Sequence, residues 1–215
     1  MPLEAVLLDF DGTVVDTTEL IYRSMRHATG EVLGRALSRE ALMANVGQPL
    51  PRQMELLDPE KAEELLEAYT LYNEENHRDL IREFPGVEAS LARLRAAGLS
   101  LAVVTSKRRF SVEKALDSFP ALGDTIDVFV TMEDTAEHKP HPAPLLKGLE
   151  LLGNVLPERA AYVGDAPFDI DAARAAGVTS VAVSWGAFTE EALRAAGPDH
   201  LFKDLNSAVG FLLKG

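Results

Sequence analysis

A short strand that ends in two acidic residues constrains this chain more than any other feature. The apolar run Ala5–Leu8 is followed at once by Asp9, Phe10 and Asp11, and then by Gly12. Four consecutive apolar residues are typical of a strand that is buried on both faces of a parallel sheet. Two carboxylates this close repel each other unless a cation or a proton lies between them. The run therefore predicts a ligand site at the carboxyl end of the first strand, although a plain turn after a strand remains an alternative.

The rest of the chain shows two different patterns. Residues 16–82 carry the periodicity of helices and contain no convincing strand, which predicts an all-helical insert. Helix starts are expected at Thr17 or Thr18, near Ser38, after Pro51 and at Asp58-Pro59.

From Pro85 onward, strands alternate with helices. Strands are expected at Leu99–Val104, Ile126–Val130, Ala160–Val163 and Val178–Val183. Helices are expected around Val87–Ala97, Val112–Phe119, Leu145–Leu152 and Ile170–Ala176, with a final pair starting at Thr189 and near Asp204. This alternation predicts βαβ units and an α/β fold whose parallel sheet is covered by helices on both faces.

Charge and composition narrow the classes of partner. The net charge is −13, from 21 basic and 34 acidic residues, which argues against nucleic acid or an anionic membrane as a partner. Because cysteine is absent, disulfides, thiolate zinc sites and cysteine nucleophiles are excluded. No apolar run is long enough to span a bilayer, so the expected location is the cytoplasm.

Two later stretches place hydroxyl groups and cations after expected strands. Thr105, Ser106 and Lys107 follow the strand at 99–104, where they predict either an anion site at a helix start or a capped helix with a surface lysine. Lys139 lies in a run that holds three prolines, so a stiff loop presents its ammonium group before a helix.

A third stretch repeats the acidic strand end. Asp165 follows the strand at 160–163, and Asp169 lies four residues later. Together with Asp9 and Asp11, these residues supply four carboxylates that can converge around a hard cation, which prefers oxygen ligands.

In this order the stretches resemble the four motifs of the haloacid dehalogenase superfamily of phosphohydrolases. Asp9–Thr13 matches the first motif, Thr105 the second, Lys139 the third, and Asp165 with Asp169 the fourth. The resemblance covers essentially the whole chain. Within the superfamily, the stretches Asp9–Asp16 and Lys139–Pro144 are most similar to phosphoglycolate phosphatases and to the related pyrophosphatase branch.

The resemblance implies a domain organisation. Residues 1–15 and 83–215 are expected to form a Rossmann-like, three-layer parallel-sheet core, and residues 16–82 an inserted helical cap domain. The loop Val46–Arg52 in that cap resembles a substrate-reading loop, which makes Arg52 a candidate substrate ligand. The alternative for Arg52 is a solvated residue at a helix start.

The resemblance also implies roles for the core residues. Asp9 is expected to attack phosphorus and form an aspartyl-phosphate, and Asp11 to act as the acid and base. Thr105 and Lys139 are expected to hold the phosphoryl oxygens as catalytic and substrate-binding groups, with Ser106 as a further substrate ligand.

The implied cofactor is Mg²⁺. Its expected ligands are Asp9, the backbone carbonyl of Asp11, and Asp165, with Asp169 as an outer ligand.

The function expected from this resemblance is hydrolysis of a small phosphorylated metabolite by a monomer or dimer, most like phosphoglycolate phosphatase. The alternatives are an inorganic pyrophosphatase, a phosphomutase of the β-phosphoglucomutase type, and a non-catalytic binding domain. The substrates of the phosphoglycolate phosphatase, the pyrophosphatase and the phosphomutase all present the same phosphoryl group to the core. The sequence therefore does not identify the leaving group.

Overall fold

The computed structural model describes residues 2–214 and centres on a six-stranded sheet in the order β5-β4-β1-β6-β7-β8. Every neighbouring pair of strands is parallel. The strands are β1 (Ala5–Leu8), β4 (Ser100–Val104), β5 (Val128–Val130), β6 (Ala160–Gly164), β7 (Thr179–Val183) and β8 (His200–Phe202). The α/β prediction is thus confirmed, and five of these strands lie where the sequence predicts them.

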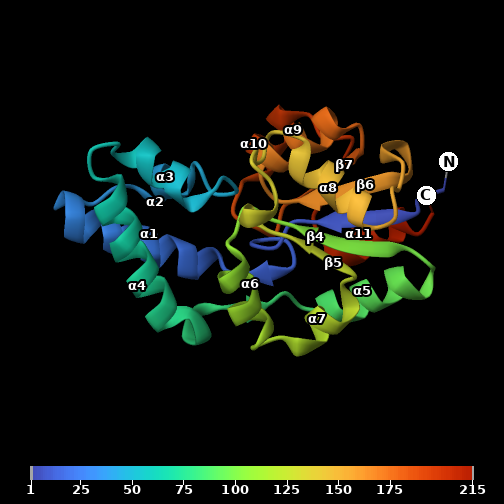
Figure 1. The fold of residues 1–215 in the computed structure, drawn as a ribbon, viewed down its shortest axis with the longest axis horizontal. Helices are drawn as coiled ribbons and strands as arrows, with labels where there is room; N and C mark the ends of the chain where they lie inside the picture. The colour runs from blue at the N-terminus through green and yellow to red at the C-terminus, as the bar shows by residue number, and fades with distance from the viewer. Residues whose placement is uncertain (1, 215) are drawn as a thin grey trace.

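Helices cover both faces of the sheet (Figure 1). One layer holds α5 (Val87–Ala96), α6 (Arg109–Leu116), α7 (Pro120–Thr125) and α11 (Leu205–Leu212), and the other holds α8 (Ala143–Leu151), α9 (Pro167–Ala176) and α10 (Glu190–Ala196). Alternate residues of β1 enter the two layers, since Val6 and Leu8 pack on one side and Ala5 and Leu7 on the other. This two-sided burial explains why the strand is apolar throughout.

Between the first and second strands of the sheet, the chain forms four helices with a hydrophobic core of their own. They are α1 (Thr18–Leu33), α2 (Arg39–Met43), α3 (Leu50–Leu57) and α4 (Ala62–Leu80), grouped at the left of Figure 1. The predicted start of α4 at Asp58-Pro59 is wrong. Asp58 ends α3, and its Oδ1 accepts a hydrogen bond from Glu60 N at 3.1 Å, so the Asp-Pro pair forms a turn.

The helical insert joins the core through a two-stranded ribbon. Strands β2 (Val15–Asp16) and β3 (Arg82–Glu83) are antiparallel, with Asp16 opposite Arg82. The predicted domain boundaries, 15/16 and 82/83, fall within this ribbon and stay a prediction. No helix within residues 2–214 combines the length and the apolar content of a membrane span.

The sheet order determines where a ligand can bind. From β1 the chain fills β4 and β5 on one side, and it later fills β6, β7 and β8 on the other. Open α/β sheets bind ligands beyond the carboxyl ends of the strands where the order reverses. Here those strands are β1, β4 and β6, which are followed by Asp9, Thr105 and Asp165.

Candidate active site

Three buried carboxylates meet at the carboxyl ends of β1 and β6. One oxygen from each of Asp9, Asp165 and Asp169 lies within 4.8 Å of the others. All three side chains are buried, with at most 3% of each residue exposed. This is a donor set of hard oxygens, and it contains three of the four carboxylates that the sequence analysis expects around a cation.

Two glycines allow the chain to pass closely over Asp165. Gly12 has a φ of 78°, and a Cβ at this position would lie 2.3 Å from Asp165 Oδ2. A Cβ at Gly186 would lie 2.1 Å from the same oxygen. Ala187 N donates to Asp165 Oδ2 at 2.7 Å, so backbone on both sides fixes this carboxylate. Gly186, which follows β7, is a site residue that the sequence analysis missed, because nothing local marks a glycine that packs against a distant acid.

Lys139 is the buried cation of the cluster. Its Nζ donates to Asp169 Oδ1 at 2.7 Å and to Tyr162 Oη at 2.9 Å, and it lies 2.9 Å from Asp9 Oδ1. Tyr162 Oη in turn donates to Val104 O at 2.9 Å. Tyr162 was also missed, since an aromatic residue in a buried strand is indistinguishable from core packing in the sequence.

The electrostatics of the cluster favour a further cation. Burial raises the pKa of Asp9 to about 7; Lys139 opposes this rise and Asp169 adds to it. Burial, together with the charges of Asp169 and Asp9, raises the pKa of Asp165 well above its usual value. Burial would lower the pKa of Lys139, but the carboxylates of Asp169 and Asp9 outweigh it and raise the pKa. Among residues 2–214, a single buried lysine thus faces three buried carboxylates, so a divalent cation fits this donor set.

The carboxylate of Asp11 does not belong to this cluster of three. Both of its oxygens accept hydrogen bonds from Lys107 Nζ, at 2.8 and 3.0 Å, and Oδ1 also accepts one from Thr17 Oγ1 at 2.7 Å. Thr17 precedes the first helix of the insert, but its hydroxyl does not cap that helix. The side chain of Asp11 therefore lies at the boundary between the core and the insert, and only its backbone is left for the predicted metal contact.

The turn after β4 contributes hydroxyl groups. Thr105 is buried, and its Oγ1 accepts a hydrogen bond from Lys107 N at 3.2 Å. Ser106 Oγ is buried and has no hydrogen-bond partner among the described residues. A ligand with oxygen atoms can satisfy this hydroxyl, as expected for a phosphate site.

A pocket opens between these strand ends and the helical insert. Its core wall includes Asp9, Asp11, Thr105, Ser106, Lys107, Arg108 and Asp165, and its opposite wall includes Val46, Gly47, Gln48, Gln53, Tyr69 and Asn73. The loop predicted to read the substrate thus reaches the pocket.

Arg52, however, does not line this pocket. Its guanidinium forms an ion pair with Glu55 at 2.9 Å, and more than half of its side chain is exposed. The structure therefore does not bring Arg52 to the other predicted site residues.

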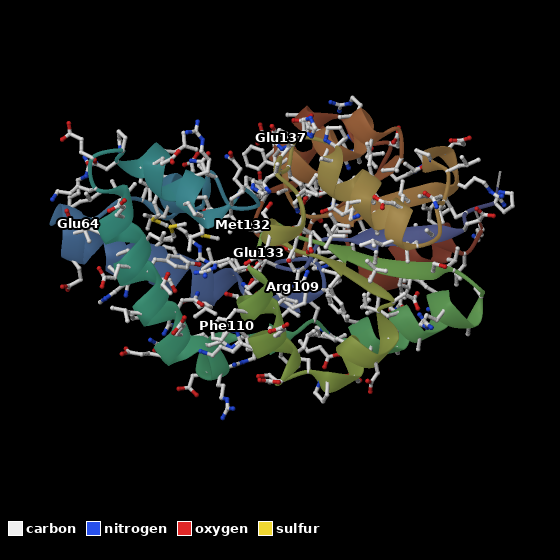
Figure 2. The ribbon with its side chains drawn as sticks, in the orientation of Figure 1. Glu64, Arg109, Phe110, Met132, Glu133 and Glu137 are labelled. Atoms are coloured by element: carbon white, nitrogen blue, oxygen red, sulfur yellow. The ribbon has the colours of Figure 1, made fainter. Side chains whose placement is uncertain are left out.

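Arg108, which the sequence analysis did not single out, lies in the pocket wall instead. The next residue, Arg109, is held outside the pocket by acids: its backbone N donates to Glu133 Oε2 at 3.0 Å, and its guanidinium pairs with Asp134 at 2.5 Å. Figure 2 shows Arg109 and Glu133 together beside α6.

These features match a known family. The sequence profile of the haloacid dehalogenase-like hydrolases matches residues 6–183, and the chain belongs to that family. Pyrophosphatase PpaX of Bacillus mycoides is 34% identical over 99% of this chain and 98% of its own length. A Caldanaerobacter subterraneus protein that is provisionally named pyrophosphatase PpaX is 42% identical over 95% of this chain and 92% of its own length.

Solved structures share the whole fold. A predicted phosphoglycolate phosphatase from Haemophilus somnus superimposes with a TM-score of 0.85 at 25% identity, covering 97% of both chains. A predicted phosphatase from Clostridium acetobutylicum gives a TM-score of 0.88 at 24% identity, covering 100% of both chains. The core and the helical insert are therefore both part of a recurring architecture.

Proposed function

We propose that this chain is a Mg²⁺-dependent phosphatase that hydrolyses a small phosphorylated metabolite through an aspartyl-phosphate, and that inorganic pyrophosphate is its preferred substrate. The observation that carries the proposal is the position of Asp9. Asp9 lines the pocket, and its buried Oδ1 pairs with Lys139 Nζ at 2.9 Å beside two further carboxylates. A carboxylate that lines a ligand pocket and is fixed by a buried lysine is a suitable nucleophile.

The proposed reaction has two steps. A carboxylate oxygen of Asp9 forms a bond to phosphorus while the bond from phosphorus to the leaving oxygen breaks, and Asp11 donates its proton to that oxygen. Asp11 then removes a proton from a water molecule, whose oxygen attacks phosphorus and releases phosphate and the Asp9 carboxylate. Thr105, Ser106 and Lys139 hold the phosphoryl oxygens during both steps. Lys107 and Thr17 hold Asp11 at the pocket in the meantime.

Asp9 and Asp165, with the backbone carbonyl of Asp11, are the proposed Mg²⁺ ligands. Asp169 orients Lys139 through their hydrogen bond. The ion supplies positive charge that offsets the charge of the phosphoryl group and of the crowded carboxylates.

We rank pyrophosphate above phosphoglycolate as the proposed substrate because of the names of the most similar relatives reported above. Those reported above at 34% and 42% identity, each spanning at least 92% of its own length, are both named pyrophosphatases. The phosphoglycolate phosphatase likeness rests on a structure at 25% identity. Phosphoglycolate is therefore the second candidate substrate.

A direct assay tests the proposal. Phosphate release should be measured with pyrophosphate, phosphoglycolate and p-nitrophenyl phosphate, each with Mg²⁺ and with a chelator. We expect hydrolysis only with Mg²⁺, and the highest kcat/KM with pyrophosphate. Absence of hydrolysis of all three compounds would refute the phosphatase proposal, whereas a preference for phosphoglycolate would refute only the choice of substrate.

Metal binding should also be visible without any substrate. Adding Mg²⁺ is expected to raise the Tm of the wild-type protein, because a ligand that binds only the folded state stabilises it. Asp165→Asn should lose most of this increase, since it removes one of the charged oxygen ligands. The matched control is Asp171→Asn, a change at an exposed residue of α9 that pairs with Arg174. An equal Mg²⁺-dependent rise in the Tm of Asp165→Asn and wild type would show that the ion binds elsewhere.

A further inference from the structure

The pocket between the core and the helical insert has an uneven distribution of charge. Among the described residues that line it, the cations are Lys107 and Arg108, and both come from the turn after β4. The wall formed by the insert contributes neutral amides, from Gln48, Gln53 and Asn73, beside apolar residues. An anionic group in this pocket must therefore find its positive partner on the core side.

Lys107 already forms an ion pair with Asp11. Its Nζ donates to both oxygens of Asp11, at 2.8 and 3.0 Å, and only 12% of its side chain is exposed. The carboxylate of Asp11 offsets its charge, so Lys107 is poorly placed to bind a second anion.

The side chain of Arg108 makes no hydrogen bond to an acid within residues 2–214. The acid paired with it is Glu133, but Arg108 Nε and Glu133 Oε1 are 4.0 Å apart, which is beyond hydrogen-bonding distance. The other oxygen of Glu133 accepts a hydrogen bond from Arg109 N. With 58% of its side chain exposed, Arg108 keeps its guanidinium donors available to a ligand.

Two further polar groups of the pocket need a ligand. Ser106 Oγ and Gln53 Oε1 are both buried without a hydrogen-bond partner among residues 2–214, and both residues line the pocket. Ser106 lies two residues before Arg108 and three before α6 begins. Buried polar atoms are rarely left without a hydrogen-bond partner, so we expect a polar ligand to supply the partners of these two atoms.

We infer that Arg108 binds the leaving group, and that the substrates of this site are phosphate compounds whose leaving group carries an anion of its own. The planar guanidinium matches either a phosphate or a carboxylate through two parallel hydrogen bonds. This inference rests on the proposed function, because it assigns the second half of the substrate in the same pocket. It assigns binding of the leaving group to Arg108 in the core, whereas the sequence analysis assigned it to Arg52 in the insert.

The experiment compares arginine variants on substrates with and without a second anion. For Arg108→Ala, kcat/KM should fall by about 10- to 100-fold with pyrophosphate, as for the loss of a charge-assisted hydrogen bond. The loss with p-nitrophenyl phosphate should be several-fold smaller, because its aromatic leaving group offers Arg108 no carboxylate or phosphate. Arg108→Lys should recover part of the loss. Arg52→Ala is the matched control, since it makes the same truncation outside the pocket, and it should leave the ratio of the two kcat/KM values unaltered.

The phosphoglycolate arm separates the two anions. A loss with pyrophosphate alone identifies a phosphate leaving group, and a similar loss with phosphoglycolate extends the site to carboxylates. Equal losses of Arg108→Ala on all substrates would overturn the inference and show that Arg108 only supports the fold. A selective loss for Arg52→Ala in its place would overturn it as well.

A binding measurement keeps this test independent of turnover. The probe is imidodiphosphate, a pyrophosphate analogue with a nitrogen bridge, titrated calorimetrically into the whole protein with Mg²⁺. Arg108→Ala should weaken its binding at least about 10-fold relative to Arg52→Ala. If wild type hydrolyses nothing but binds the analogue through Arg108, the proposed catalysis fails and the binding site stands. Unchanged affinity in Arg108→Ala would refute the site itself.

Discussion

Replacing Asp9 with asparagine is expected to lower kcat by at least about 10³-fold, because the amide cannot act as the nucleophile in the first step. The fold should survive this change. Asparagine has nearly the same shape, and it removes a buried acid whose pKa burial raises to about 7. The measurements are steady-state phosphate release and the unfolding midpoint in urea. In wild type, rapid quenching during turnover should trap a phosphoryl group on the protein, and Asp9→Asn should show none.

Asp171→Asn makes the same chemical change on an exposed surface and should leave kcat unaltered. Mass spectrometry of the Asp9→Asn protein must show an intact asparagine, since slow deamidation would restore the nucleophile. If the intact variant retained a tenth or more of wild-type activity, Asp9 would have no covalent role.

The second large effect is expected at Lys139. Lys139→Met keeps much of the side-chain volume but leaves Asp9 and Asp169 buried without their cation. Removing one partner of a buried ion pair costs about 3–5 kcal/mol of unfolding free energy, and this loss should appear in urea denaturation of the chelator-treated protein. Mg²⁺ should recover part of it, because the ion replaces a missing positive charge among the carboxylates.

Lys147→Met provides the comparison on the surface. Lys147 pairs with Glu150 at 3.1 Å on α8, and the Glu150 side chain is 59% exposed, so its loss should cost less than about 1 kcal/mol. Equal urea midpoints for Lys139→Met and Lys147→Met would show that the buried carboxylates take up protons and need no lysine.

The fold can be predicted from the sequence where a buried element consists of consecutive apolar residues. Strand β1 could be predicted because all four of its residues are buried on one face or the other. Strand β8 was missed, since it is short and half-buried at the sheet edge. It is held by packing against the helix that follows it: the rings of His200 and Phe202 lie against Phe211 of α11, with centroids 4.0 and 5.6 Å away.

The residues of the candidate site can be predicted most directly where an acidic or hydroxyl residue comes directly after a strand. Asp9, Thr105 and Asp165 are found in this way, because each comes directly after a strand of the parallel sheet. Lys139 does not directly follow a strand; its proline-rich loop singled it out, and the family resemblance supplied its role. Arg52 and Arg108 show the limit of such reasoning. Arg52 lies in the first turn of α3 and Arg108 directly before α6, and nothing in the sequence tells that Arg108 is the one that lines the pocket.

Because of the β2–β3 ribbon, the helical insert can be removed or exchanged as one unit. Asp16 and Arg82 are paired across the ribbon, so the ends of the 65 intervening residues, 17–81, are as close together as the two sides of a hairpin. A two-residue turn of the Asn-Gly type can join such ends and leave the core without the helical insert. By the same geometry, the helical insert of a relative can be grafted at this one place without altering the order or register of the six-stranded sheet. The residues that the insert contributes to the pocket wall can then change as one unit, while the residues at the strand ends stay the same.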